Sequence, residues 1–214
     1  MITDKIMIMG AMKDVELNLI LDNLTDVNVH EEMSCTFYEG KLFDKNIVVC
    51  HTNIGTINAA VATFAGIRKY NPTSIFVIGT AGAHREEIHR GDIVVATKII
   101  NLNSINYETK FFETSNDLLK MIKETEVTNV YNVYYGIVGS GDVWTKNPDK
   151  IKELNNQYST LCEEMESAAI YEVSQKYDIP VVSIRVISNN EITGEEYDRE
   201  TGEVAQKILL ELLK

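Results

Sequence analysis

Short apolar runs that end in glycine or a small polar residue recur along the chain, and segments with helical spacing of apolar residues separate them. Uninterrupted runs rich in Ile and Val are typical of strands buried on both faces. They predict strands at Lys5–Met9, Cys35–Tyr38, Ile47–His51, Ser74–Ile78, Asp92–Ala96, Asn132–Val138 and Pro180–Ile187. The segments between them predict helices at Met12–Leu24, Asn58–Tyr70, Leu118–Lys123, Glu163–Lys176 and Glu195–Leu213.

This alternation predicts an α/β protein with three layers, in which helices flank a central mixed, twisted sheet on both sides. No linker, repeat or low-complexity stretch interrupts residues 1–214, so we expect a single domain. A chain of 214 residues is long enough to bury a sizeable core. Its 44% of hydrophobic and 24% of charged residues are typical of a soluble globular protein.

The chain carries a formal net charge of −12. An acidic surface repels nucleic-acid phosphates and anionic lipid, so we expect neither nucleic acid nor a membrane as partner. Met1–Lys5 lacks the apolar stretch of a signal peptide, and no apolar run reaches the roughly 20 residues that span a bilayer. Cys35, Cys50 and Cys162 are widely spaced and indicate reduced thiols in a cytoplasmic protein. Neither they nor the four His residues show a metal-ligand spacing, so we expect no metal and no cofactor.

Glycine and small polar residues mark the ends of several predicted strands. These ends are Gly10-Ala11-Met12, Gly79-Thr80-Ala81-Gly82, Gly139-Ser140-Gly141-Asp142 and Ser188-Asn189. Glycine lets a ligand approach the backbone and leaves N–H donors accessible to it. One such glycine would indicate only a turn. Because ligands bind where the strands of α/β sheets end, the recurrence predicts a small-molecule site.

These segments resemble the nucleoside phosphorylase/nucleosidase superfamily, most closely the 5′-methylthioadenosine/S-adenosylhomocysteine nucleosidases. The resemblance extends over nearly the whole chain. Besides Gly10-Ala11-Met12, it is carried by part of Asn53-Ile54-Gly55, by Gly79-Thr80-Ala81-Gly82, Gly91-Asp92-Ile93-Val94-Val95, Ser140-Gly141-Asp142 with Trp144, Glu164-Met165-Glu166 and Arg185–Asn189. It implies a purine nucleoside phosphorylase-like fold, a purine nucleoside as small-molecule partner, cleavage of its N-glycosidic bond, a place in methionine salvage and a homodimer.

Cleavage of that bond gives the sugar oxocarbenium character, and the base leaves as an anion unless it is protonated. The site then needs a carboxylate on the sugar hydroxyls, a donor at the base nitrogen N7 and a positioned nucleophile. The resemblance places Glu166 on the ribose hydroxyls, where each charged hydrogen bond is worth roughly 1.5–3 kcal/mol, and Met165 against the sugar. The alternative is that Glu163, Glu164 and Glu166 are carboxylates favoured at a helix start.

Trp144 occupies the family's aromatic position and is expected to stack on the base or shape the pocket, whereas a buried core tryptophan is the alternative. The remaining substrate-binding candidates are Val143, Thr80, Ala81, Gly82 and Glu164.

The chain departs from the family at the residue that activates water. Hydrolases of the family carry Glu three residues after the Met of Gly-Ala-Met, and Val15 stands there. Asp14 and Glu16 are its neighbours, but one residue rotates a helix by about 100°, so neither simply substitutes. A local shift of the helix start would bring Glu16 into the site as the catalytic base.

A second departure concerns the group that meets the base. The family's Asp, which protonates N7, is replaced by Asn189. An amide donates a hydrogen bond but does not transfer a proton. It pairs with the O6 and protonated N7 of a 6-oxopurine, whereas the amino group of adenine favours an acceptor. Asn189 therefore indicates inosine-like or futalosine-like substrates.

Phosphorolysis would require an anion site, usually built from Arg and glycine-loop N–H groups. Arg185 fits a position near the nucleophile, and Thr80 is a possible helper. His84 and Arg85 are the other nearby candidates, but a solvated turn is the favoured explanation for them, and the early Gly-Asp-Pro-x-Arg phosphate loop is missing.

The first hypothesis is an N-glycosyl hydrolase for 5′-methylthioadenosine- or S-adenosylhomocysteine-like nucleosides, with reduced or altered activity. A 6-oxopurine nucleosidase and a purine nucleoside phosphorylase are the alternative enzymes. A catalytically impaired nucleoside-binding protein is the alternative of another class.

Overall fold

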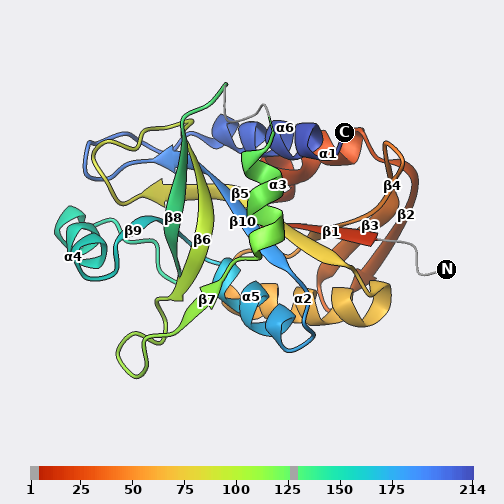
Figure 1. Cartoon of the computed structure of the whole chain (residues 1–214), viewed down its shortest axis with the longest axis horizontal. Coiled ribbons are helices and arrows are strands. Elements are labelled where there is room, and N and C mark those ends of the chain that lie inside the picture. Colours follow the sequence, from red (N-terminus) through yellow and green to blue (C-terminus); the bar gives the residue numbers. More distant parts are fainter. Residues whose placement is uncertain (1–4, 126–129) are drawn as a thin grey trace.

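Ten strands form one mixed sheet in the computed structural model, which describes residues 5–125 and 130–214 (Figure 1). The expectation about a signal peptide rests on Met1–Lys5, of which residues 1–4 lie outside the described residues. The strands are β1 (Lys5–Gly10), β2 (Thr25–Glu32), β3 (Cys35–Leu42), β4 (Lys45–His51), β5 (Ser74–Ala83), β6 (Ile93–Asn101), β7 (Phe111–Glu113), β8 (Val133–Ser140), β9 (Thr160–Glu164) and β10 (Val181–Asn189). The helices are α1 (Asn18–Asp22), α2 (Thr56–Tyr70), α3 (Asn116–Lys123), α4 (Pro148–Tyr158), α5 (Ser167–Gln175) and α6 (Gly202–Leu212).

Strand β5 is the hub of the sheet. Its first half pairs in parallel with β1, and β10 runs parallel to it along almost its whole length. Its last residues, Gly82 and Ala83, pair antiparallel with β9. Because β10 continues to β6, β6 to β8 and β8 to β9, these five strands close into a ring, and β4, β3 and β2 extend the sheet beyond β1.

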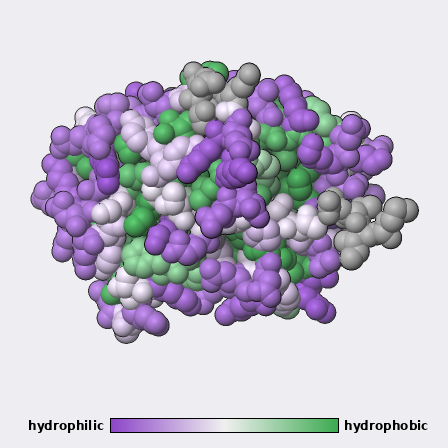
Figure 2. Space-filling model, in the orientation of Figure 1, coloured by the Kyte–Doolittle hydropathy of each residue, from purple (hydrophilic) through white to green (hydrophobic). Residues whose placement is uncertain are grey.

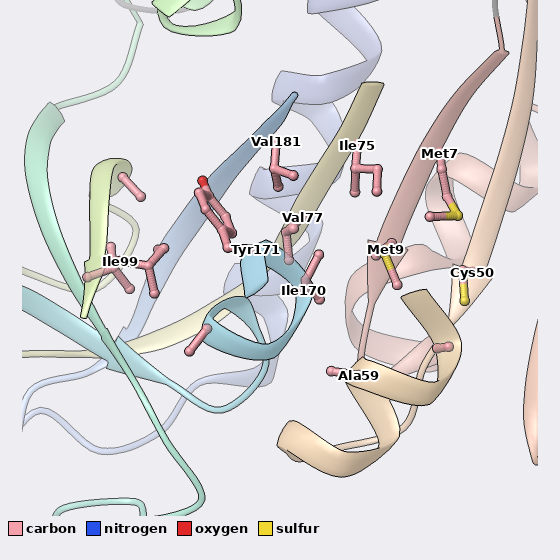
Figure 3. Packing of buried hydrophobic residues seen from close by; sticks show 14 of the residues in the cluster. Met7, Met9, Cys50, Ala59, Ile75, Val77, Ile99, Ile170, Tyr171 and Val181 are labelled. Atoms are coloured by element: carbon pink, nitrogen blue, oxygen red, sulfur yellow. The ribbon is translucent and has the colours of Figure 1, made fainter. Parts of the chain in front are cut away.

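Two apolar cores lie on opposite faces of the sheet. Figure 1 shows α2 and α5 along one face of the sheet, and α1 and α6 along the other. Helix α3 lies in front of the sheet in this view. Met7, Met9 and Val77 belong to the core on the side of α2 and α5, and Val77 lies beside Tyr171 of α5 (Figure 3). Ile8, Phe76 and Ile184 point to the opposite face of the sheet. They belong to the second core, which lies beneath α1, α3 and α6. This arrangement confirms the predicted three-layer mixed α/β fold.

Polar side chains cover most of the face shown in Figure 2, with apolar residues emerging in smaller areas between them. Within the described residues, no helix combines the length and the apolar character that crossing a membrane requires.

Several element boundaries differ from those expected. β2 was not expected, because it is a mostly exposed edge strand in which only Val27 and Val29 are apolar, and backbone pairing to β3 holds it. The strand expected over Cys35–Tyr38 continues through Gly40 to Leu42. The Gly79–Gly82 segment is not a loop but the second half of β5. Helix α4 and the short strand β7 were also missed.

Two predicted helices begin several residues later than expected, and a third is divided. Glu163 and Glu164 belong to strand β9, and helix α5 starts only after its N-cap residue, Glu166. The C-terminal helix starts at Gly202 because a loop and one 3₁₀ turn occupy residues 195–201. The helix expected over Met12–Leu24 divides into a π-helical turn, Lys13–Leu17, and α1.

Candidate active site

A cavity of about 290 Å³ opens where β1, β5 and β10 end beside β9 and the loop after β8. It is lined by Ala11, Met12, Glu16, Ile54, Thr80, Ala81, Gly82, Val143, Trp144, Glu163, Glu164, Met165, Glu166, Ser188, Asn189 and Tyr197. Every sequence-predicted site residue except Arg185 is in this lining. The glycine-marked strand ends therefore meet at one place.

A π-helical turn carries Glu16 into the cavity. Such a turn holds one residue more than an α-helical turn, and turns of this kind are frequent at functional sites. Its carboxylate is buried, and Oε2 accepts hydrogen bonds from the backbone N–H groups of Ala11 (2.8 Å) and Met12 (3.0 Å). Oε1 accepts from the N–H of Thr80 at 3.0 Å. Three backbone donors thus hold Glu16 as an acceptor at the bottom of the site.

The neighbours of Glu16 point elsewhere. Asp14 is exposed. Val15 lies against the start of α6, because a β-carbon added at Gly202 would come within 2.5 Å of Val15 Cγ1. The extra residue of the turn therefore places Val15 outside the cavity and Glu16 inside it, which is the local shift the sequence left open.

Glu166 is the second buried carboxylate of the cavity. Its Oε1 accepts from the backbone N–H of Gly55 at 2.9 Å. Within the described residues, no hydrogen bond to Oε2 is found, so this oxygen is open to a ligand. Burial, reinforced by the nearby charge of Glu164, raises the pKa of Glu166 to about 8, although Arg185 opposes the shift.

Arg185 lies beneath the cavity, with only 1% of its side chain exposed. Its Nη2 donates to Glu164 Oε2 at 2.5 Å and to Ser167 Oγ at 3.0 Å. Glu164 Oε2 also accepts from the N–H groups of Glu166 and Ser167, both at 3.0 Å. Arg185 and Glu164 thus neutralise each other and brace the turn that presents Glu166.

Gly79 leaves room for the guanidinium of Arg185 and the carboxylate of Glu16. A β-carbon at Gly79 would lie 2.6 Å from both Arg185 Nη1 and Glu16 Oε1. Since hydrogen bonds hold both side chains, only glycine fits there without displacing one of them.

Asn189 lies in the wall of the cavity at the end of β10. Its Oδ1 is 3.0 Å from the hydroxyl of Ser188, and its Nδ2 donates to Glu191 Oε1 at 3.2 Å. Gly82 faces the amide closely, since a β-carbon there would lie 3.3 Å from Nδ2.

Two aromatic rings flank the mouth of the cavity. Trp144 and Tyr197 have ring centroids 6.1 Å apart at an interplanar angle of 59°. Trp144 is 46% exposed, which rules out the core role considered as its alternative. Its loop is anchored at Thr145, whose N–H and hydroxyl both donate to the buried Glu163.

The candidates for a phosphate site do not converge on the cavity. His84 is buried 3.3 Å from Glu163, and Arg85 lines a separate surface hollow where it lies 3.7 Å from Glu87. The N–H of Thr80 is taken by Glu16. The cavity is instead lined by four carboxylates, those of Glu16, Glu163, Glu164 and Glu166.

Within the described ranges, no group of three or more His, Cys, Asp or Glu side chains is arranged to hold a metal ion.

Sequence reasoning missed Tyr197 and the role of Glu163 as an anchor. Tyr197 was placed in the first turn of a helix, and only its aromatic character between two acidic residues could have drawn attention to it. Ile54 and Ser188 stood in segments that were noted, but they were not predicted to line the cavity.

A family model described as the phosphorylase superfamily matches residues 5–214. The chain is 29% identical to the 5′-methylthioadenosine/S-adenosylhomocysteine nucleosidase of Staphylococcus haemolyticus, over 97% of this chain and 98% of that protein. Its fold matches the enzyme of that name from S. pneumoniae, solved with the transition-state inhibitor MT-ImmA, with a TM-score of 0.87, 26% identity and 98% coverage of both chains. It also matches the futalosine hydrolase of Helicobacter pylori, with a TM-score of 0.89, 23% identity and coverage of 99% and 97%. This last likeness concerns the fold alone.

Proposed function

The chain belongs to the phosphorylase superfamily, and within it we propose that the protein is a purine nucleosidase. It is an N-glycosyl hydrolase that cleaves 5′-methylthioadenosine- or S-adenosylhomocysteine-like nucleosides. The two nucleosidases named above are called after this activity.

The position of Glu16 carries this proposal. A buried carboxylate held by three backbone N–H groups is suited to orient a water molecule and accept its proton. The composition of the cavity favours hydrolysis over phosphorolysis, because its lining offers carboxyl groups to an anion and Arg185 is already paired with Glu164.

In the proposed reaction, Glu166 accepts hydrogen bonds from the ribose hydroxyls through its open oxygen, and Met165 packs against the sugar. Water oriented by Glu16 attacks C1′ and gives its proton to the carboxylate. The bond from C1′ to the base nitrogen breaks, and its electron pair leaves with the base, an anion, toward Asn189 and Trp144. The departing base then takes up a proton from water. Arg185 and Glu164 position the two catalytic carboxylates from below.

A panel of purine nucleosides in phosphate-free buffer tests the proposal. We expect free base from at least one of 5′-methylthioadenosine, S-adenosylhomocysteine, adenosine and inosine, measured by chromatography. Binding without release of base from any of them would identify a nucleoside-binding protein instead.

A 6-oxopurine nucleosidase is the second candidate, and Asn189 is the observation that favours it. If the amide sets the preference, Asn189→Asp should shift relative kcat/KM toward 6-aminopurine nucleosides. The new carboxyl group would face Glu191, and two adjacent carboxylates share a proton because one pKa rises, so the pair would hold the proton that N7 needs. The kcat/KM ratio of adenosine to inosine measures the shift, and a ratio that stays constant or moves toward inosine contradicts it.

We further propose a homodimer, formed through the face of α2 and the loop before β7. Ile57 is 78% and Tyr107 91% exposed, and Phe64 of α2 forms an exposed aromatic pair with Tyr177, which follows α5. Asp142 bonds both Thr56 and Asn103 and thus links the loop to the start of α2.

We expect Ile57→Asp to shift the protein from dimer to monomer in analytical ultracentrifugation, because it places a charge in an apolar interface. Met33→Asp, which changes another exposed apolar residue at the β2–β3 turn, should leave the dimer intact. A wild-type protein that sediments as a monomer would refute this proposal.

The cytoplasm as location and methionine salvage as pathway also remain proposals. They rest on the reduced-cysteine composition and on the activity named for the relatives.

A further inference from the structure

We propose that Glu191 is a positioning residue that fixes the orientation of the Asn189 amide and thereby makes the cavity discriminate between purines by their group at position 6. The inference rests on the proposed function in one respect, namely that a purine base meets Asn189.

The immediate neighbours of the amide do not determine its orientation. An asparagine side chain presents an oxygen acceptor on one side and a nitrogen donor on the other, and rotation by 180° exchanges them. Ser188 Oγ lies 3.0 Å from Asn189 Oδ1 and 3.2 Å from the carbonyl oxygen of Ala81. A hydroxyl either donates to Asn189 Oδ1 or donates to Ala81 and accepts from the amide nitrogen, so Ser188 satisfies both orientations.

Glu191 breaks this symmetry. Its Oε1 lies 3.2 Å from Asn189 Nδ2, and an ionised carboxylate only accepts hydrogen bonds. In the rotated state, Asn189 Oδ1 would face the Glu191 carboxylate. The charged hydrogen bond would then be lost, and two acceptors would lie side by side. Glu191 therefore selects the orientation in which the amide nitrogen points toward it.

A fixed amide offers the base one N–H and one oxygen lone pair in a set order. With the oxygen at N7, it accepts from a protonated N7 and donates to the O6 of a leaving 6-oxopurine. With the nitrogen at N7, it donates to the unprotonated N7 of adenine and accepts from the 6-amino group. Each orientation suits one class of base, so an amide free to rotate would serve both.

Glutamine at position 191 tests this directly. Its side-chain amide accepts from Asn189 Nδ2 in one orientation and donates to Asn189 Oδ1 in the other, so it preserves the contact but removes the selection. Glu196 provides a matched control, because it is an exposed carboxylate on the same loop.

We expect Glu191→Gln to bring the kcat/KM ratio of adenosine to inosine closer to one by about tenfold, the order expected for a charged hydrogen bond. The gain should come from the substrate that the wild-type protein disfavours, whose kcat/KM rises. A purely structural defect would lower both values. Glu196→Gln should leave the ratio unchanged, and both variants should keep the wild-type thermal midpoint.

Equilibrium binding of adenine and hypoxanthine, measured by calorimetry, separates this inference from the proposed function. If the ratio of their Kd values in Glu191→Gln stays within twofold of wild type, or if both bases bind equally to the wild type, the inference is wrong even when nucleosides are hydrolysed. If the ratio changes as expected but no nucleoside is cleaved, the inference stands and the hydrolase proposal fails.

Discussion

Glu16→Gln should lower kcat for nucleoside hydrolysis by about 10²–10⁴-fold, the usual contribution of a general base. The amide keeps the size of the side chain, but its single oxygen can accept only from Ala11 and Met12 on one side or from Thr80 on the other, and it cannot take a proton from water. Steady-state release of free base from the best substrate measures the effect, with circular dichroism to verify the fold.

Two neighbouring variants make this test specific. Asp14→Asn changes an exposed carboxylate on the same turn and should leave kcat within about twofold, as surface substitutions usually do. Val15→Glu restores the residue type that the family resemblance led us to look for, but Val15 packs at the start of α6, so the change should destabilise the protein without raising activity. A more active Val15→Glu, or a fully active Glu16→Gln, would show that Glu16 is not the base.

Glu166→Gln should lower kcat/KM by at least about tenfold, equivalent to about 1.4 kcal/mol in the transition state. Hydrogen bonds donated by the ribose hydroxyls favour the ionised form of Glu166, and the neutral amide of glutamine accepts weaker ones. Glu172→Gln, on the outer side of the same helix, is the matched control, and its kcat/KM should not change. An unchanged kcat/KM in Glu166→Gln would remove Glu166 from the site.

The same variant should be more stable than the wild type in alkaline buffer. Because the folded-state pKa of Glu166 is raised to about 8, its contribution to stability is present below the ordinary pKa of a glutamate and is lost as the pH rises through about 8. Glutamine avoids that loss. We expect a higher thermal midpoint than wild type at about pH 8.5, and a difference that shrinks toward about pH 5. A wild-type midpoint that is equal or higher in the alkaline buffer would contradict the raised pKa.

The glycine-rich and polar segments that follow the apolar runs were predictable because local sequence determines them, although Gly79–Gly82 forms the second half of β5 and not its end. Gly79–Gly82 and Ser188-Asn189 follow uninterrupted apolar runs, and the topology that brings β5 beside β10 also brings their ends together. The place of Glu166 in the cavity was predictable from the family resemblance of Glu164-Met165-Glu166, although the helix expected from Glu163 begins only at Ser167.

The π-helical turn was not predictable in the same way. Its extra residue is accommodated by bonds from Glu16 to Thr80, 64 positions away, and no local pattern encodes such contacts. Glu163 and Glu164 looked like helix-start carboxylates, yet they lie in a buried strand because Arg185 and Thr145 satisfy them. Tyr197 lines the cavity from a loop. The sequence prediction placed it in the C-terminal helix, because it extended the helical pattern of α6 from Gly202 back to Glu195.

The most direct test of hydrolysis is to identify the sugar released from the best substrate, with and without saturating phosphate. Because the carboxylates of the cavity exclude phosphate and Glu16 is placed to activate water, we predict equal rates of base release and a free pentose in both conditions. Release that depends on phosphate and yields a pentose 1-phosphate would contradict the account.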